Sequence, residues 1–248
     1  MKKKILLSSR PIALITGAAS SLGSAISRKL TDQGFNIALH YGKSKSKTLV
    51  LKQELESEGS EVLLIHANLA DPSQSNQLIQ KVVSCWGRLD LVVNCASVFE
   101  PTVLSTKDFK KWNYILNVNT FSPVSIAIAA KPWLEKHQGS VVNITDIYGE
   151  FPVLKDHAAY STSKAALIFL TKYLALALGE KIRVNAVSPG VITFPKNYSQ
   201  GQRKKLAAKS ALKRQGTPDE IADAVWFLAS NYFVTGQVLR VDGGRFIS

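Results

Sequence analysis

The stretch that decides the fold is residues 12–23, which read IALITGAASSLG. A short apolar run is followed by a turn of small residues, and residues 22–33 then carry their apolar side chains at the spacing of one helix face. This order predicts a buried parallel strand, a tight turn and an amphipathic helix. Such a unit points backbone N–H groups and a helix N-terminus at a pyrophosphate, so the chain is expected to bind a nucleotide near its start.

The small residues of this turn have separate roles in the prediction. Gly17 is expected to allow the tight turn, and Gly23 to let the helix pack closely on the strand. Ser21 stands where the usual spacing has its middle glycine, so the motif departs from the pure glycine pattern. We expect the cofactor phosphates to meet this turn at Gly17, Ser20, Ser21, Leu22 and Gly23.

Further strand-like segments alternate with helix-like ones along the chain. The predicted strands are residues 36–40, 62–66, 89–94, 140–144, 183–188 and 238–241. This alternation predicts an α/β fold with a single-domain, doubly wound (Rossmann-type) parallel sheet and helices on both faces. The domain is expected to span residues 1–248, with a flexible basic segment at residues 1–10. Thr217 to Glu220 form a capping box that predicts a helix running to about Ala229.

Length and composition are consistent with one domain and argue against several other classes of protein. The chain has 248 residues with 46% hydrophobic content, which is enough to bury a full core. No segment approaches the ~18 consecutive apolar residues of a membrane span, and the apolar run after Lys4 is too short for a signal peptide. Cys85 and Cys95 form neither a disulfide framework nor a metal-ligand cluster, and Cys95 is expected to be a packing residue. We therefore expect a cytoplasmic protein without a metal site.

The charge is strongly basic, with 31 Lys and Arg against 18 Asp and Glu, a formal net charge of +13. A basic surface is one mark of nucleic-acid binding. Here the basic residues are scattered in small clusters, and no stacking aromatic residues interleave with them. We therefore expect no nucleic-acid partner, and attribute the charge to attraction of an anionic cofactor and substrate or to solubility.

Tyr160 and Lys164 form the pattern that points to catalysis. They are four residues apart and so share one face of a helix, and Asp146 lies fourteen residues before Tyr160. A lysine ammonium beside a phenol favours the phenolate, so we expect Lys164 to lower the pKa of Tyr160. A Tyr/Lys pair alone is more often an ordinary surface pair, and the nucleotide-binding start is what makes this one a candidate active site.

Together these residues resemble the short-chain dehydrogenase/reductase family over nearly the whole chain. The resemblance implies that Asn68 and Leu69 lie beside the adenine, and Asn94, Ala96 and Ser97 along the cofactor. It implies that Asn119 completes the active site with Tyr160 and Lys164. Tyr160 and Lys164 are also expected to contact the cofactor, Lys164 at the nicotinamide ribose, and Pro189 and Gly190 to lie beside the nicotinamide. Residues 241–244, VDGG, match the family's last strand and turn. Homotetramers are usual in the family, so a homotetramer is expected here.

The end of the second predicted strand indicates which dinucleotide binds. Sites for NAD place an acidic residue there to hold the ribose 2′-hydroxyl. This chain has none over residues 39–45, where His40, Tyr41, Lys43 and Ser44 are expected to contact the cofactor, with His40, Lys43 and Ser44 available to a 2′-phosphate. The prediction is NADPH; the alternative is a solvated loop with no cofactor preference.

Asp146 stands where most of the family has a serine that donates a hydrogen bond to a substrate carbonyl. Two like charges ~4 Å apart at an effective dielectric near 20 repel by about 4 kcal/mol, roughly a thousandfold in rate, so an ionised carboxylate opposes a developing alkoxide. Reduction of C=N reverses the sign, because the protonated nitrogen is a cation that a carboxylate stabilises. Asp146 therefore favours an imine substrate. The alternative is that Asp146 only caps its turn.

Three features narrow the resemblance to the pteridine reductase and dihydromonapterin reductase branch. They are Asp146 in place of serine, the HYGKS sequence at residues 40–44, and Ser97-Val98-Phe99. The resemblance implies that a flat pterin lies between the nicotinamide and the Phe99 ring, with Ser97, Asp146 and Tyr160 as further substrate contacts. The alternative for Phe99 is loop packing. Arg245, in the DGGR sequence near the carboxyl end, is also similar to this branch, and it is a candidate to reach a neighbouring site in a tetramer.

The sequence-based hypothesis is an NADPH-dependent reductase that converts a dihydropterin or folate (dihydromonapterin, dihydrobiopterin or dihydrofolate) to its tetrahydro form. Hydride is expected to reach the C=N carbon while Tyr160 and Asp146 deliver the proton. Asn119 and Lys164 are expected to hold a water chain that refills it. Two alternatives stay open. One is a carbonyl reductase, for example of 3-oxoacyl thioesters, with Asp146 protonated by burial; the other is a non-catalytic NADPH-binding regulator. Residues 191–203 are expected to form a small lid over the site.

Overall fold

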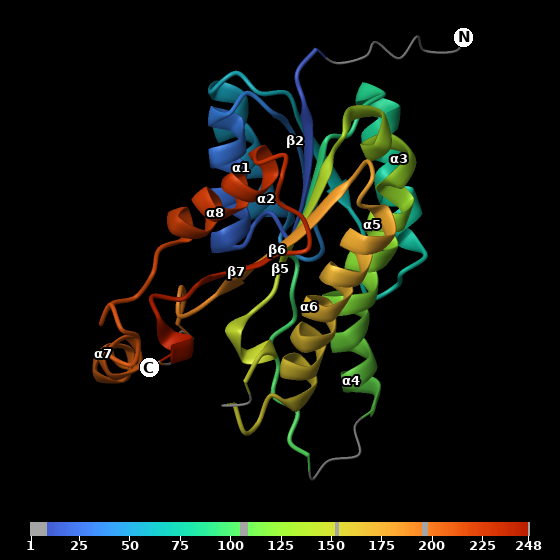
Figure 1. Cartoon of the computed structure of the whole chain (residues 1–248). Coiled ribbons are helices and arrows are strands. Elements are labelled where there is room, and N and C mark those ends of the chain that lie inside the picture. Colours follow the sequence, from blue (N-terminus) through green and yellow to red (C-terminus); the bar gives the residue numbers. More distant parts are fainter. Residues whose placement is uncertain (1–8, 105–108, 152–153, 195–197, 248) are drawn as a thin grey trace.

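A computed structural model describes residues 9–104, 109–151, 154–194 and 198–247. A seven-stranded sheet runs through its centre in the order β3-β2-β1-β4-β5-β6-β7, and every neighbouring pair is parallel (Figure 1). The strands are β1 Ile12–Thr16, β2 Asn36–Tyr41, β3 Val62–His66, β4 Leu91–Asn94, β5 Ser140–Ile144, β6 Arg183–Pro189 and β7 Val238–Val241. The predicted fold class is confirmed. Most of the expected flexible segment at residues 1–10 lies outside the described residues.

Helices cover both faces of the sheet (Figure 1). On one side lie α1 Ser21–Asp32, α2 Lys45–Ser57 and α8 Pro218–Ser230, and on the other lie α3 Gln74–Trp86, α4 Phe109–Leu116, α5 Ser122–Leu134 and α6 Ala158–Leu178. A short helix, α7 Gln200–Ala207, stands away from the sheet beside the carboxyl end. In the described part of the chain, no helix is long and apolar enough to cross a bilayer.

The side-chain alternation of β1 explains the two apolar layers. Ala13 and Ile15 belong to the cluster under α1 and α8, whereas Ile12 and Leu14 belong to the cluster under α3 and α5. All four side chains are fully buried. Because β1 is buried on both faces, its sequence is a continuous run of apolar residues and does not alternate with polar ones.

Most predicted boundaries agree with the structure to within a residue or two. The capping box before α8 forms as expected, with Glu220 N donating to Thr217 Oγ1 at 3.3 Å and Thr217 N donating to Glu220 Oε2 at 2.8 Å. The strand predicted from residue 89 begins instead at Leu91. Leu89 is fully buried ahead of the strand, so its apolar character reports on the core and not on the sheet ladder.

The parallel topology brings the carboxyl ends of the strands to one edge of the sheet. From β1 the chain continues to β2 on one side, and from β4 it continues to β5 on the other side. The ends of these two neighbouring strands therefore form the switch point where α/β sheets bind ligands. The turn after β1 and the loops after β2, β4, β5 and β6 all leave from this edge, and they carry nearly all of the residues predicted to form the site.

Candidate active site

A cleft of about 1060 Å³ follows this edge of the sheet. Its lining includes twelve of the residues that the sequence predicted to bind the cofactor: Gly17, Ser20, Ser21, Leu22, His40, Tyr41, Lys43, Ser44, Asn68, Leu69, Ala96 and Ser97. It also includes ten residues that the predicted site did not contain: Ala19, Gly42, Lys47, His66, Ala67, Cys95, Val98, Tyr114, Val118 and Thr193. The expected cofactor site is therefore assembled in one place.

The two glycines of the first turn do what the sequence predicted. Gly17 has φ +65°, and a Cβ there would lie 2.7 Å from Ala96 Cα. Gly23 lies inside α1, where a Cβ would lie 2.5 Å from Gly17 O. Both contacts are with backbone, so a side chain at either position forces the turn and its neighbours apart.

His40 does not have its predicted role. Its ring is buried, Nδ1 accepts a hydrogen bond from Gly17 N at 3.1 Å, and Nε2 lies 3.0 Å from Ala67 O. Burial lowers the pKa of His40 to about 4, so the ring is neutral at physiological pH. A neutral imidazole with both nitrogens in use is no ligand for a phosphate; His40 instead fixes the glycine turn against the ends of β2 and β3.

The cationic groups beside this turn come from the next few residues. Lys43 and Ser44 line the cleft as expected, and Lys47 joins them from the first turn of α2. His66 arrives from β3 because it pairs with Tyr41 in the parallel ladder. The register of two strands, which is not readable from either strand alone, places His66 here. The lining of the cleft contains no Asp or Glu.

Six predicted cofactor residues lie outside the lining of this cleft: Gly23, Asn94, Tyr160, Lys164, Pro189 and Gly190. Asn94 is buried and donates from Nδ2 to Asn143 Oδ1 at 2.8 Å, which joins β4 to β5; its side chain is used within the protein, and its contact with the cofactor stays a prediction. Pro189 ends β6, and Gly190 follows it. A Cβ on Gly190 would lie 2.6 Å from Asp242 Cα, so this glycine lets the end of β6 approach the segment after β7.

The predicted catalytic residues form one connected group. Tyr160 Oη donates to Asp146 Oδ2 at 2.6 Å, and Tyr148 N donates to Asp146 Oδ1 at 2.9 Å. Lys164 Nζ donates to Ile144 O at 2.9 Å and lies 5.7 Å from the centre of the Tyr160 ring. Tyr160 and Lys164 are both buried. Asp146 caps the short helix at Ile147–Gly149 and also bonds to the phenol, so its role goes beyond capping.

The electrostatics differ from the expectation that Lys164 lowers the pKa of Tyr160. Burial and the neighbouring Asp146 carboxylate raise the pKa of Tyr160 well above its ordinary value. Burial also raises the pKa of Asp146, against the hydrogen bonds from Tyr148 and Tyr160 that stabilise its anion. The expectation omitted the carboxylate at 2.6 Å, which opposes phenol ionisation more directly than a lysine that bonds to a carbonyl.

Lys164 gives a testable pH dependence. Burial lowers its pKa from 10.5 to about 8 despite the favourable charge of Asp146. If the ammonium form is needed, kcat/KM for NADPH, which reports on the free enzyme, falls as pH rises through about 8. The folded state binds fewer protons than the unfolded state between these two pKa values, so the unfolding free energy attributable to Lys164 rises with pH across that window. A pH–rate profile of the wild type that stays flat to pH 10 would contradict the assignment.

Asn119 is committed to the loop after β4. It lies in a π-helical turn, Asn117–Phe121, between α4 and α5. Its Oδ1 accepts from Val98 N at 2.8 Å, and its Nδ2 donates to Val98 O and Ser163 Oγ, each at 3.0 Å. Every polar atom of the side chain is therefore satisfied by protein, and Asn119 fixes the loop that carries Ser97 and Phe99. The water chain between Asn119 and Lys164 stays a prediction.

Phe99 packs against Tyr160 and against a second ring that the sequence did not predict, and its contact with a pterin stays a prediction. Its ring is 4.7 Å from that of Tyr160 and nearly perpendicular to it, and it stacks on His157 at 4.2 Å. Phe99 is 48% exposed, so it is not simply packed into the loop. His157 directly precedes α6, and its Nδ1 lies 2.8 Å from Asp156 Oδ1. No local sequence pattern predicts this stacking, because it depends on contact between two loops.

Arg245 and the expected lid lie at the other side of the catalytic loop. Arg245 hydrogen bonds to Tyr148 of the same chain and counteracts the rise in the pKa of that phenol, which burial and Asp146 cause. The structure thus gives Arg245 a partner within its own chain. Residues 195–197 of the expected lid lie outside the described residues, and its later part begins α7.

Known proteins resemble the chain over nearly its whole length. A family model described as "Enoyl-(Acyl carrier protein) reductase" matches residues 17–245. The 3-oxoacyl-[acyl-carrier-protein] reductase FabG of Staphylococcus epidermidis is 32% identical over 241 residues, 95% of this chain and 98% of the relative. The protein of the same name from Thermotoga maritima is 34% identical over 243 residues, again 95% and 98%. A solved blue fluorescent protein from a metagenomic library, in complex with NADPH, matches with a TM-score of 0.88 and 33% identity, over 95% of this chain and 97% of that chain.

Proposed function

Because the chain belongs to the short-chain dehydrogenase/reductase family, we propose that it is an NADPH-dependent reductase of the C=N bond in a pterin-type heterocycle. The observation that carries this proposal is the hydrogen bond of 2.6 Å between Tyr160 Oη and Asp146 Oδ2. This bond puts a carboxyl group in contact with the proton donor. A carboxylate there stabilises a protonated ring nitrogen, whereas it opposes the negative charge that develops on a carbonyl oxygen.

NADPH fits the cleft and supplies the hydride when bound. The solved relative at 33% identity binds NADPH, and the residues of this chain suit the same molecule. The first turn brings backbone N–H groups and the start of α1 to the cleft. Lys43 and Lys47 provide positive charge for a 2′-phosphate, and the lining has no carboxylate to repel it.

The chain's own residues account for the movement of the proton. Tyr160 donates its hydroxyl proton to the ring nitrogen, and Asp146 stabilises the positive charge on that nitrogen. Lys164 lies behind the phenol and holds its position through Ile144 O, while its charge offsets that of the carboxylate. Phe99, fixed above Tyr160, offers an aromatic surface to a flat ring system.

A second function, reduction of 3-oxoacyl thioesters, is favoured by the relatives. Those from S. epidermidis and T. maritima are both named 3-oxoacyl-[acyl-carrier-protein] reductases. Burial raises the pKa of Asp146, and a protonated carboxyl group can donate a hydrogen bond to a developing alkoxide. The two candidates therefore differ in the protonation state of one side chain.

One assay separates the candidates. NADPH oxidation is followed by absorbance with dihydromonapterin, dihydrobiopterin, dihydrofolate and an acetoacetyl thioester in parallel. Turnover of the pterins or the folate alone supports the C=N reading. Turnover of the thioester alone supports the second candidate and removes the first. NADPH binding without turnover of any of them supports a regulator that has lost catalysis.

Replacing Lys43 by aspartate tests the cofactor assignment. The change turns an attraction for the 2′-phosphate into a repulsion, so the KM for NADPH is expected to rise about tenfold or more while the KM for NADH changes little. The matched control is Lys81→Asp, which makes the same charge change in α3, outside the lining of the cleft. Equal KM values for NADPH in the Lys43 variant and the wild type would contradict a 2′-phosphate site at this position.

We also propose that the chain forms a homotetramer, as the family resemblance implies. Apolar side chains are exposed on α5 and α6, with Ile128 at 61%, Phe169 at 67% and Leu176 at 85%. Large apolar groups gathered on a surface usually mark a contact with another molecule, here a second copy. Light scattering that gives a monomer mass at micromolar concentration would remove this proposal.

A further inference from the structure

The loop that carries Asp146 is tied to the last strand of the sheet by an ion pair. Glu150 lies four residues after Asp146. Arg240 Nε on β7 lies 3.0 Å from each of its carboxylate oxygens, and Arg240 Nη2 donates to Oε2. Ser188 Oγ, in β6, lies 3.3 Å from the same carboxylate. The Glu150 side chain is only 15% exposed, so the pair is partly shielded from water.

Aromatic rings extend this contact to the carboxyl terminus. The Arg240 guanidinium lies 4.0 Å from the centre of the Phe246 ring. Phe246 packs edge-on against Phe151 with centroids 5.2 Å apart, and its N–H donates to Asp242 Oδ2 at 2.8 Å. Glu150, Phe151, Arg240 and Phe246 thus form one cluster, which we call the C-terminal latch.

The opposite side of the loop rests on the catalytic helix. A Cβ on Gly149 would lie 2.7 Å from Ala165 N and from Lys164 C, so the loop lies directly on the backbone of α6. Gly149 N also donates to Asp146 O at 2.9 Å. Residues 146–149 therefore lie between α6 and the C-terminal latch, which begins at Glu150.

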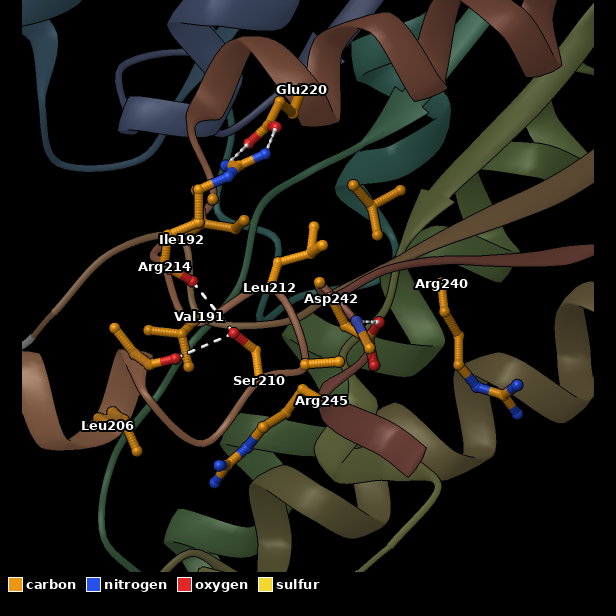
Figure 2. A pocket seen from close by; sticks show the side chains of 16 residues that line it. Val191, Ile192, Leu206, Ser210, Leu212, Arg214, Glu220, Arg240, Asp242 and Arg245 are labelled. Carbon is orange, nitrogen blue, oxygen red and sulfur yellow. Dashed lines mark hydrogen bonds and ion pairs between the residues drawn. The ribbon is translucent and has the colours of Figure 1, made fainter. Parts of the chain in front are cut away.

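The segment at residues 240–245 also borders a pocket, and Leu212 N donates to Gly243 O at 3.0 Å beside it. The pocket has a volume of about 370 Å³, with Ile192, Leu206 and Leu212 among its walls (Figure 2). The side chains of Arg240 and Arg245 leave this segment in different directions in the same view.

We propose that Arg240 is a positioning residue of the active site, which acts through Glu150 and Phe246 to hold Asp146 at hydrogen-bond distance from Tyr160. The inference rests on the roles proposed for Asp146 and Tyr160. It extends the active site to the last strand and the carboxyl-terminal turn, far from Tyr160 in the sequence. Removal of the guanidinium frees residues 146–151 to move away from α6.

The test is Arg240→Gln, compared with Arg28→Gln as a matched control. Arg28 makes a similar two-point contact with Glu54, at 2.5 and 3.0 Å, between α1 and α2; the two arginines are similarly exposed, although Glu54 is more exposed than Glu150. In Arg240→Gln, kcat is expected to fall roughly tenfold to hundredfold, because small displacements of reacting groups have large effects, while the Kd for NADPH stays within twofold. Hydrogen exchange of the Tyr148, Gly149 and Glu150 amides is expected to speed up about tenfold. Arg28→Gln should change none of these.

Two further measurements distinguish positioning from general stability. Glu150→Gln and the double variant with Arg240→Gln should each lower kcat about as much as Arg240→Gln alone, as expected for groups that act together. Arg240→Lys should recover part of the loss. An unchanged kcat in Arg240→Gln would overturn the inference. Equal losses of kcat in Arg240→Gln and Arg28→Gln would overturn it as well. Hydrogen exchange needs no substrate, so it reports on the latch even if the proposed substrate is wrong.

Discussion

Tyr160→Phe is expected to lower kcat by a factor of roughly a thousand or more, the upper part of the range for loss of general acid catalysis. Removal of the hydroxyl deletes the proton donor. It also removes the hydrogen bond of 2.6 Å to the partly buried Asp146 carboxylate, which then keeps only the one from Tyr148 N. The ring itself remains to pack against Phe99. Single-turnover kinetics with NADPH and the active substrate would measure the loss at the chemical step.

The control for this experiment is cofactor binding. The hydroxyl of Tyr160 contacts Asp146 and does not belong to the lining of the cofactor cleft, so the Kd for NADPH should stay within a few-fold of the wild type. Tyr114→Phe, which removes a phenol that does line the cleft, provides a matched comparison. A Tyr160→Phe variant with more than a tenth of the wild-type kcat would show that the proton comes from elsewhere.

Asp146→Ala is expected to lower turnover of a dihydropterin by about a hundredfold to a thousandfold and to leave NADPH binding unchanged. Without the carboxylate, a protonated ring nitrogen has no nearby negative charge. Asp146→Ser provides the informative contrast, because a hydroxyl donor suits a carbonyl. Its ratio of thioester to pterin turnover should rise relative to that of the wild type. Full activity of Asp146→Ala on the pterin would remove the C=N proposal.

The stability of an Asp146→Asn variant tests the direction of the Asp146 pKa shift without any substrate. Burial raises the pKa of Asp146 above 3.8, so the folded state holds its proton more tightly than the unfolded state. The stabilising contribution of the acid is fully present below the unfolded pKa and is lost as pH rises through the folded pKa. Asparagine does not titrate, so the stability of the variant relative to the wild type should increase from pH 4 to pH 7. Urea unfolding at both pH values would measure this.

The sequence was sufficient to predict the sheet, the glycine turn and the grouping of Asp146, Tyr160 and Lys164. Each depends on a local pattern: an apolar run, a small-residue turn or a helical spacing of four. The parallel sheet then brings the ends of separate strands together without further information. Twelve residues of the cofactor cleft followed from this logic.

The errors share a different origin, because they depend on which groups happen to be within hydrogen-bond distance. His40 was assigned to the phosphate, but its ring bonds to Gly17 and Ala67. The predicted direction of the Tyr160 pKa shift was wrong. The phenol hydrogen bonds to the Asp146 carboxylate, whereas the Lys164 ammonium hydrogen bonds to the Ile144 carbonyl and not to the phenol. A sequence states what a side chain can do, and the fold selects its partner.

The turn after β1 also bears on how cofactor preference can change over time. The groups that shape this turn, Gly17, Gly23 and the neutral His40, are fixed by backbone contacts. Lys43 and Lys47, which face the cleft, make no contact that shapes the turn. Lys43 and Lys47 can therefore be replaced while Gly17, Gly23 and His40 are retained. Selection for the shape of the turn and selection for the cofactor then act on separate residues. If the two lysines hold the 2′-phosphate as proposed, substitutions there can change the preference between dinucleotides while the glycine turn is kept.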